Sequence, residues 1–170
     1  MRAWIKINQP IINLDYRELA EKMWFNFYLD KELELSHGGN SEWLKDSYTL
    51  DLKWDKSLND KRWIQKKFAT EHISLNPIRD NKFLYIETDH IHILTVDKRA
   101  FYIMVQELAT VVGGFISLDG MKTWFSLKEF QQKYYALLSM SFEEANERSL
   151  KEVETLECVD EPWDNEVIYD

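Results

Sequence analysis

The chain has 170 residues, of which 45% are hydrophobic and 14% aromatic, and its formal net charge at pH 7 is −9. This length fits one domain, and so apolar a composition supports a packed core, which excludes a wholly disordered chain. A pI near 5.0 argues against nucleic acid as a partner. The single cysteine, Cys158, excludes an internal disulfide and a zinc site made of several cysteines.

The start of the chain lacks the apolar run of a secretory signal, because Lys6 and Pro10 interrupt it. Apolar stretches elsewhere fall far short of the roughly 20 residues that a membrane span needs. A lone cysteine also suits a reducing compartment. We therefore expect a soluble, cytoplasmic protein that does not contact a membrane.

The N-terminal segment combines one strand pattern with one helix pattern. Residues 4–7 predict a short strand, and Asp15 followed by Glu18 resembles a capping box at the start of a helix. The apolar residues that follow recur at helical spacing and define one broad face: Tyr16, Leu19, Ala20, Met23, Trp24, Phe27 and Tyr28.

The segment between residues 36 and 68 contains a loop, a strand and a short helix by the same criteria. Residues 36–41 include two adjacent glycines and predict a loop. Residues 48–55 alternate apolar and polar side chains, which predicts a strand with one buried and one wet face. Asp60 then opens a short helix with three apolar residues on one side: Trp63, Ile64 and Phe68.

The middle of the chain favours two strands followed by a helix. Residues 83–88 and 91–96 read as strands joined by a turn at 89–90, although one long strand fits the same pattern. Asp97 is expected to cap the next helix, and Gly113 stands where a C-terminal cap glycine belongs. The predicted buried stripe of that helix is Phe101, Met104, Val105, Leu108 and Val112.

Turn and capping signals organise the region before the C-terminal segment. Residues 119–120 form an Asp-Gly turn signal ahead of a short strand at 122–125. A capping box at 126–129 opens a helix, and the signature recurs at 141–144. The inward residues of the first of these helices are Leu127, Phe130, Tyr134, Leu137 and Leu138.

Helices and hairpins alternate here without the regular strand–helix rhythm of parallel-sheet folds. We therefore expect an α+β fold with a mainly antiparallel sheet and helices packed on one face. Residues 1–142 would form a single α+β domain, and residues 143–170 an acidic C-terminal helix or tail, either free or packed on that domain.

All of the net charge lies in residues 143–170, which hold eleven acidic residues against two basic ones. Such an asymmetry indicates a basic partner. Large apolar residues among the acids favour a protein-binding surface, because charge steers an encounter and aromatic residues anchor it. A solubilising tail and a packed helix with its acids facing water are the alternatives. The predicted partner-binding residues are Glu154, Glu157, Asp160, Glu161, Trp163, Asp164, Glu166 and Tyr169.

His90 and His92 form the one metal-like pair, because alternate residues of a strand share a face. The nearest further carboxylates, Glu87 and Asp89, lie on the opposite face of a regular strand. We therefore interpret the histidines as structural or surface residues and expect no metal and no cofactor.

No catalytic motif stands out. Cys158 lies among acids that disfavour its thiolate, so a nucleophilic role is not expected. The chain lacks the glycine-flanked serine elbow, and its glycine pairs lack the lysine and spacing of a phosphate loop. We predict no catalytic residues and no enzymatic activity.

A basic stretch lies between residues 53 and 67, interleaved with Trp54 and Trp63. Nucleic-acid surfaces share this pattern, but neighbouring aspartates dilute the charge. We favour a solvated helix face that can receive the acidic tail. The basic residues are Lys53, Lys56, Lys61, Arg62, Lys66 and Lys67.

Residues 107–124, which begin ELA and end GGFISLDGMKTW, are followed by SLKEF at residues 126–130. Together with the small acidic chain, these segments resemble the immunity proteins that bacteria pair with secreted or contact-dependent toxins. The resemblance implies a cytoplasmic inhibitor that binds a cognate toxin domain tightly and covers its active site. No binding motif matches position by position, so no residue role carries over.

We therefore expect a non-enzymatic immunity or inhibitor protein that neutralises a toxin domain through an acidic and aromatic surface. Nuclease domains are basic where they hold phosphates, and an acidic surface can occupy that site. The alternative is a general protein-interaction or scaffold module. A metal-dependent enzyme built around His90 and His92 comes third.

Overall fold

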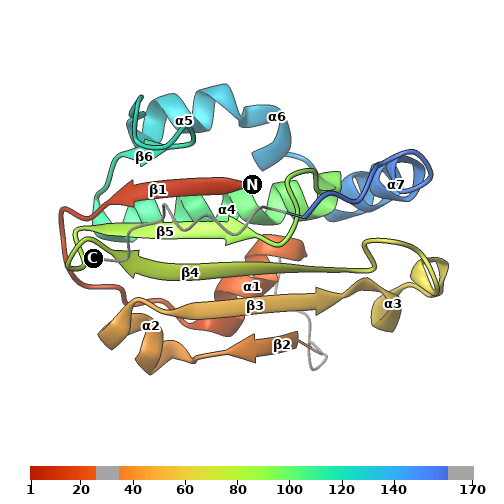
Figure 1. The fold of residues 1–170 in the computed structure, drawn as a ribbon, viewed down its shortest axis with the longest axis horizontal. Helices are drawn as coiled ribbons and strands as arrows, with labels where there is room; N and C mark the ends of the chain where they lie inside the picture. The colour runs from red at the N-terminus through yellow and green to blue at the C-terminus, as the bar shows by residue number, and fades with distance from the viewer. Residues whose placement is uncertain (26–34, 161–170) are drawn as a thin grey trace.

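An antiparallel six-stranded sheet is the framework of the computed structural model, which describes residues 1–25 and 35–160. The strands lie in the order β2-β3-β4-β5-β1-β6, side by side in Figure 1. Their bounds are β1 Arg2–Lys6, β2 Leu35–Gly38, β3 Leu50–Asp55, β4 Thr70–Ile78, β5 Phe83–Thr88 and β6 Ile116–Ser117. The α+β class with a mainly antiparallel sheet is confirmed.

One face of the sheet is apolar because the strand register brings alternate residues together. Leu52 lies opposite Ile73, and Leu75 lies opposite Ile86. On the other side of β5, Ile86 is paired with Ala3. All five side chains are fully buried. Burial of this row removes a continuous apolar strip from water and anchors the helices that cover it.

Most of the helices pack around α4, which lies behind the sheet together with α1 in Figure 1, whereas α2 and α3 lie near β2 and β3. The longest helix, α4, contacts α1, α5, α6, α7 and β1. Its predicted apolar stripe is buried, and Gly113 ends it with a left-handed φ of 59° that a glycine adopts without strain. The bounds are α1 Tyr16–Trp24, α2 Ser41–Ser47, α3 Lys56–Asn59, α4 Thr95–Val112, α5 Leu127–Lys133, α6 Tyr135–Leu138 and α7 Phe142–Glu152, with a 3₁₀ turn, η1, at Lys61–Trp63.

The strongest local patterns formed the expected elements. The strand predicted at 4–7 is β1, and the helix predicted after Asp15 is α1. The Asp15 carboxylate accepts hydrogen bonds from the backbone N–H groups of Arg17 and Glu18. The alternation at 48–55 became β3. Two residues of the predicted α1 face, Phe27 and Tyr28, lie outside the described residues.

The loop predicted at 36–41 is correct only for Gly39 and Asn40. Residues Leu35–Gly38 form β2, and α2 begins at Ser41 behind an Asn40 cap. This edge strand carries a serine, a histidine and a glycine, so it has no apolar alternation. Pairing with β3 stabilises it instead, and strand propensity depends strongly on such context.

Strand β4 was not predicted, and its residues Asn76 and Pro77 are of types that strands disfavour. The described pairing of β4 with β3 ends at Leu75, and beyond it β4 pairs with β5. Pro77 therefore lies past the β3 ladder, where a missing N–H removes no bond on that side.

The second strand predicted at 91–96, and the turn before it, are also wrong. Helix α4 already begins at Thr95. Leu94 occupies the N-cap position without a side-chain cap, and Asp97, the predicted cap, lies inside the first turn. Asp97 is unavailable for capping because it is buried and paired with Lys56.

Before α7 the predicted capping box forms, whereas the predicted strand does not. The strand predicted at 122–125 is reduced to one bridge between Phe125 and Ile116. The capping box between Ser126 and Glu129 is present. The single helix expected after it is divided into α5 and α6, because a break occurs at Tyr134.

Candidate functional site

The acidic segment begins with a helix that packs on the body. Helix α7 contacts α4, and its N-cap Ser141 hydroxyl accepts a hydrogen bond from the Glu144 N–H at 3.1 Å. Ala145, Ser149 and Val153 are buried. Up to that point the acidic segment is therefore a docked amphipathic helix rather than a solvated tail.

Two side chains of α7 accept hydrogen bonds from the first backbone N–H groups of α4 and so cap that helix. The Thr95 N–H donates to the Glu152 carboxylate at 2.8 Å, and the Val96 N–H donates to the Ser149 hydroxyl at 2.9 Å. The first N–H groups of a helix have no intrahelical partner, and Leu94 supplies none here. Glu152 is thus a structural acid, which sequence reasoning could not find because its partners lie 57 residues earlier.

A chain of polar contacts fixes α7 to η1. The Trp63 indole N–H donates to Asn146 at 2.9 Å, and the Asn146 amide donates to Asp60 at 3.0 Å. The Arg62 guanidinium donates to the same Asp60 oxygen, Oδ2, at 2.7 Å. Hydrogen bonds from Arg62 are the main reason why the pKa of Asp60 is lowered to about 2.

The basic stretch receives part of the acidic segment. Arg62 pairs with Glu147 at 2.6 Å, and Lys66 pairs with Glu154. The interleaved tryptophans are not a stacking surface for bases, because Trp54 and Trp63 are buried. The predicted contact between this face and the acidic segment is confirmed for these two pairs.

Three of the eight predicted partner-binding residues are described. Glu154, Glu157 and Asp160 are exposed, and the Asp160 side chain is 90% exposed. The other five predicted residues, Glu161, Trp163, Asp164, Glu166 and Tyr169, lie outside the described residues.

On the outer side of α7, Glu143, Glu144 and Glu147 are also exposed. We call the exposed acids from α7 to residue 160 the acidic strip: Glu143, Glu144, Glu147, Glu154, Glu157 and Asp160.

A second group of charges lies inside the protein, between the sheet and α4. Lys56 pairs with Asp97 at 2.8 Å, and both side chains are almost fully buried. The Lys56 ammonium also donates to the Phe68 carbonyl at 3.0 Å, and the Trp24 indole donates to Asp97 at 3.4 Å. Burial raises the pKa of Asp97, and Lys56 opposes that shift.

Glu71 and His90 extend this interior group to the surface. Glu71 is 1% exposed, and its carboxylate contacts the His90 Nδ1 at 2.7 Å. Burial and the nearby Asp97 charge raise the pKa of Glu71 to about 7, and His90 partly offsets the shift. On the opposite side of its ring, the His90 Nε2 lies 3.7 Å from Asp160.

The metal pair considered for His90 and His92 does not form. His90 lies after the end of β5 rather than within a strand, and His92 is exposed. Of the two carboxylates, Glu87 lies 3.9 Å from Arg2, and Asp89 contacts His72 at 3.2 Å. The metal pair was an incorrect possibility because it placed His90 and His92 in one strand, whereas the chain forms a loop there.

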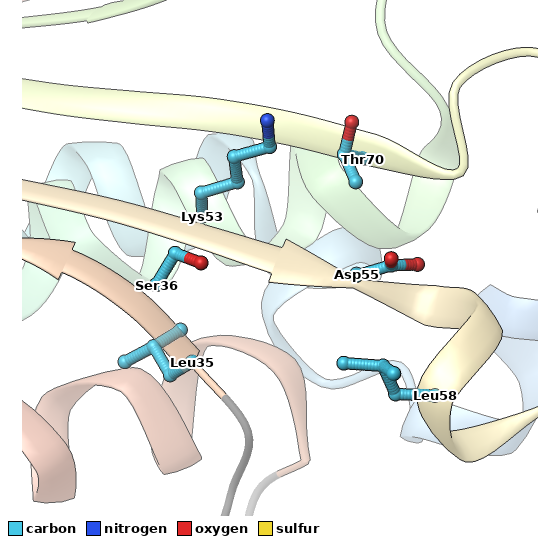
Figure 2. A pocket seen from close by; sticks show the side chains of 6 residues that line it. All are labelled: Leu35, Ser36, Lys53, Asp55, Leu58 and Thr70. Atoms are coloured by element: carbon cyan, nitrogen blue, oxygen red, sulfur yellow. The ribbon is translucent and has the colours of Figure 1, made fainter.

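An open groove of about 390 Å³ lies beside the β2 edge of the sheet. Figure 2 shows Leu35 of β2 and Leu58 of α3 at its two ends. Its other lining residues are Ser36, Lys53, Asp55 and Thr70. The lining thus combines two hydroxyls with one cation and one carboxylate.

Comparison of the chain with protein-family models, curated proteins and solved structures finds no significant match. Among residues 1–25 and 35–160, no helix has the length and apolar character to cross a bilayer.

Proposed function

We propose that the protein is a non-enzymatic cytoplasmic inhibitor that binds a basic protein domain, as an immunity protein binds its toxin. The observation that carries this proposal is the acidic strip, which is exposed although its helix is docked on the body. A nuclease toxin fits this role, because its phosphate-binding site offers the complementary charge.

Docking of α7 gives the strip a defined geometry before any partner arrives. The buried contacts of Ala145 and Ser149 and the bond from Trp63 to Asn146 hold the helix in place. A surface that is already ordered loses less conformational entropy on binding. The strip can therefore steer a basic partner and bind it without first folding.

The strip is only partly neutralised by the body. Arg62 and Lys66 each pair with one of its acids, and Arg148 pairs with Glu144 within α7. Glu143, Glu157 and Asp160 face solvent. Exposed charges of this kind raise association rates more than they raise affinity.

The test uses the product of the gene next to this one, which under this proposal is the toxin. Calorimetry measures its binding to the full chain, and a growth assay measures whether co-expression abolishes its toxicity. The variant Glu143→Gln/Glu157→Gln removes two charges from the strip. We expect it to slow association and weaken binding several-fold at low salt, with a smaller effect at high salt.

The matched control is Glu42→Gln/Asp46→Asn, which removes two exposed charges from α2 at the opposite end of the molecule (Figure 1). It should leave binding unchanged. Equal weakening by both variants, or no binding of the neighbouring product, would refute the proposal. Binding without loss of toxicity would identify a scaffold instead of an inhibitor.

Removal of the whole acidic segment is not a clean test of its role in binding. A cut after Met140 would remove α7 and uncover α4, so lost binding could reflect unfolding. A chain cut after Asp160 keeps every described element. Loss of binding by this shorter chain would assign the recognition role to the predicted residues beyond it, and full binding would assign it to the strip.

A further inference from the structure

Three potential metal-binding side chains meet at the surface end of the interior charges. The His90 imidazole, the Cys158 sulfur and the Asp160 carboxylate each place one ligand atom within 4.8 Å of the other two. They come from the loop after β5 and from the segment after α7. The sequence of neither segment predicts this cluster, because it pairs His90 only with His92.

Backbone pairing holds the two segments together. His90 and Asp160 form an antiparallel bridge, and the Ile91 N–H donates to the Val159 carbonyl at 2.9 Å. In an extended chain, residues two positions apart point to the same side. Cys158 and Asp160 therefore both reach toward His90, which the distances among the three ligand atoms bear out.

The His90 ring is already oriented as a metal ligand. The buried Glu71 carboxylate lies 2.7 Å from the His90 Nδ1 and also accepts from the His90 N–H at 3.3 Å. When Glu71 is ionised its carboxylate can only accept, so Nδ1 of the neutral ring carries the proton and Nε2 presents its lone pair. A carboxylate behind a histidine is the usual outer contact of a metal-ligating imidazole.

We propose that the His90 Nε2, the Cys158 thiolate and the Asp160 carboxylate bind a zinc ion, with water as the fourth ligand. Nitrogen, sulfur and oxygen together suit Zn²⁺, whereas Mg²⁺ and Ca²⁺ require oxygen ligands. Bond lengths of about 2.0–2.3 Å place the ligand atoms of a tetrahedral zinc about 3.3–3.7 Å apart. The 3.7 Å between His90 Nε2 and Asp160 slightly exceeds the roughly 3.3–3.5 Å expected between a nitrogen and an oxygen ligand. Both Asp160 and Cys158 are exposed, so small rotations of their side chains can bring the ligand atoms to the zinc.

Zinc bound here would fasten the chain at Asp160, itself a predicted partner-binding residue and the last one before the five that lie outside the described residues. The site does not depend on the proposed function, and it can be tested without any partner.

The experiment uses the full chain after removal of metal with a chelator. Zn²⁺ affinity is measured by competition with a chromophoric chelator, and Co²⁺ serves as a spectroscopic probe. We expect one Zn²⁺ per chain and, with Co²⁺, the charge-transfer band of a thiolate ligand. Cys158→Ser should abolish that band, and Asp160→Asn should weaken Zn²⁺ binding.

Two further variants separate ligands from neighbours. His92→Gln changes an exposed histidine two positions away and should leave binding unchanged. Glu71→Gln, which acts through His90, should weaken binding by about 10- to 100-fold. Because Cys158 and Asp160 are exposed, their variants should fold like the parent chain, as circular dichroism would verify.

Absence of stoichiometric Zn²⁺ binding would overturn the proposal. So would parent-like binding by Cys158→Ser, or a loss in His92→Gln as large as the loss in Cys158→Ser.

Discussion

The charged residues of this protein form two contrasting groups. Lys56, Asp97, Glu71 and Arg99 lie in the interior, where each has a fixed partner. The acids of the strip lie on the surface, and two of them, Glu143 and Glu157, form no ion pair with a described residue. Interior charges constrain how the helices are placed, whereas surface charges are available to a partner.

Arg99 illustrates the first group. Its guanidinium donates to the carbonyls of Met23 and Met140, each at 2.8 Å, and to the Trp24 carbonyl at 3.3 Å. One side chain of α4 thereby binds the end of α1 and the approach to α7. Burial lowers its pKa to about 10, which leaves it charged at neutral pH.

The largest effect should follow from breaking the interior pair. Lys56→Met leaves the buried Asp97 carboxylate without its cation, and we expect the free energy of unfolding to fall by about 3–5 kcal/mol. Urea denaturation measures this loss. The exposed Lys53→Met is the control and should change little. Lys56→Met/Asp97→Asn should recover part of the loss, and a larger loss in the double variant would contradict the assignment.

An intermediate effect should appear in acid. The pKa of Asp60 is about 2 when folded against 3.8 unfolded, so its contribution to stability is complete above pH 3.8 and disappears as the pH falls toward 2. This contribution is about 2 kcal/mol. In Asp60→Asn that part of the acid dependence should vanish. Unfolding curves between about pH 2 and pH 5, a range that spans both pKa values, provide the measurement, and an unaltered pH profile would exclude this role for Asp60.

A smaller loss is expected where α7 caps α4. Ser149→Ala removes the acceptor for the Val96 N–H and should destabilise the protein by about 1 kcal/mol. Thermal unfolding of the variant is compared with that of Ser139→Ala, an exposed serine outside this contact. Equal melting temperatures for the two variants would show that the cap does not stabilise α4.

The smallest effect should come from the surface pairs, which sharpens the contrast between the two groups. Lys66→Gln removes the cation beside Glu154, and exposed pairs contribute only about 0–1 kcal/mol. Stability should hardly change, while association with a basic partner should become faster because the strip gains net negative charge. Stopped-flow binding measures the rate, and slower association would contradict the role of the strip.

Sequence patterns correctly predicted the elements that are stabilised by contacts between residues close together in the chain. Asp15 capped α1, residues 50–55 alternated, and the Ser126 capping box formed. Prediction failed where distant contacts decide. Strand β4 carries Pro77 past the β3 ladder, and β2 exists only through its partner strand.

The candidate sites follow the same rule. The charge of the C-terminal segment was visible from composition, but the structural role of Glu152 was not, because it caps a helix 57 residues earlier. His90 meets Glu71 from β4 and Asp160 from beyond α7, and no spacing along the chain encodes such a meeting. The sequence around Cys158 predicts no metal site, because the histidine is brought beside it only by the bridge between His90 and Asp160.

The cap that α7 supplies to α4 also has a consequence for biosynthesis. The N–H groups of Thr95 and Val96, at the start of α4, have no side-chain acceptor until residues 149 and 152 have been made. While the ribosome is still adding this segment, α4 is exposed at that end, and the nascent chain relies on water or chaperones there. Completion of the core is therefore a late event, set by the same segment that carries the surface charge.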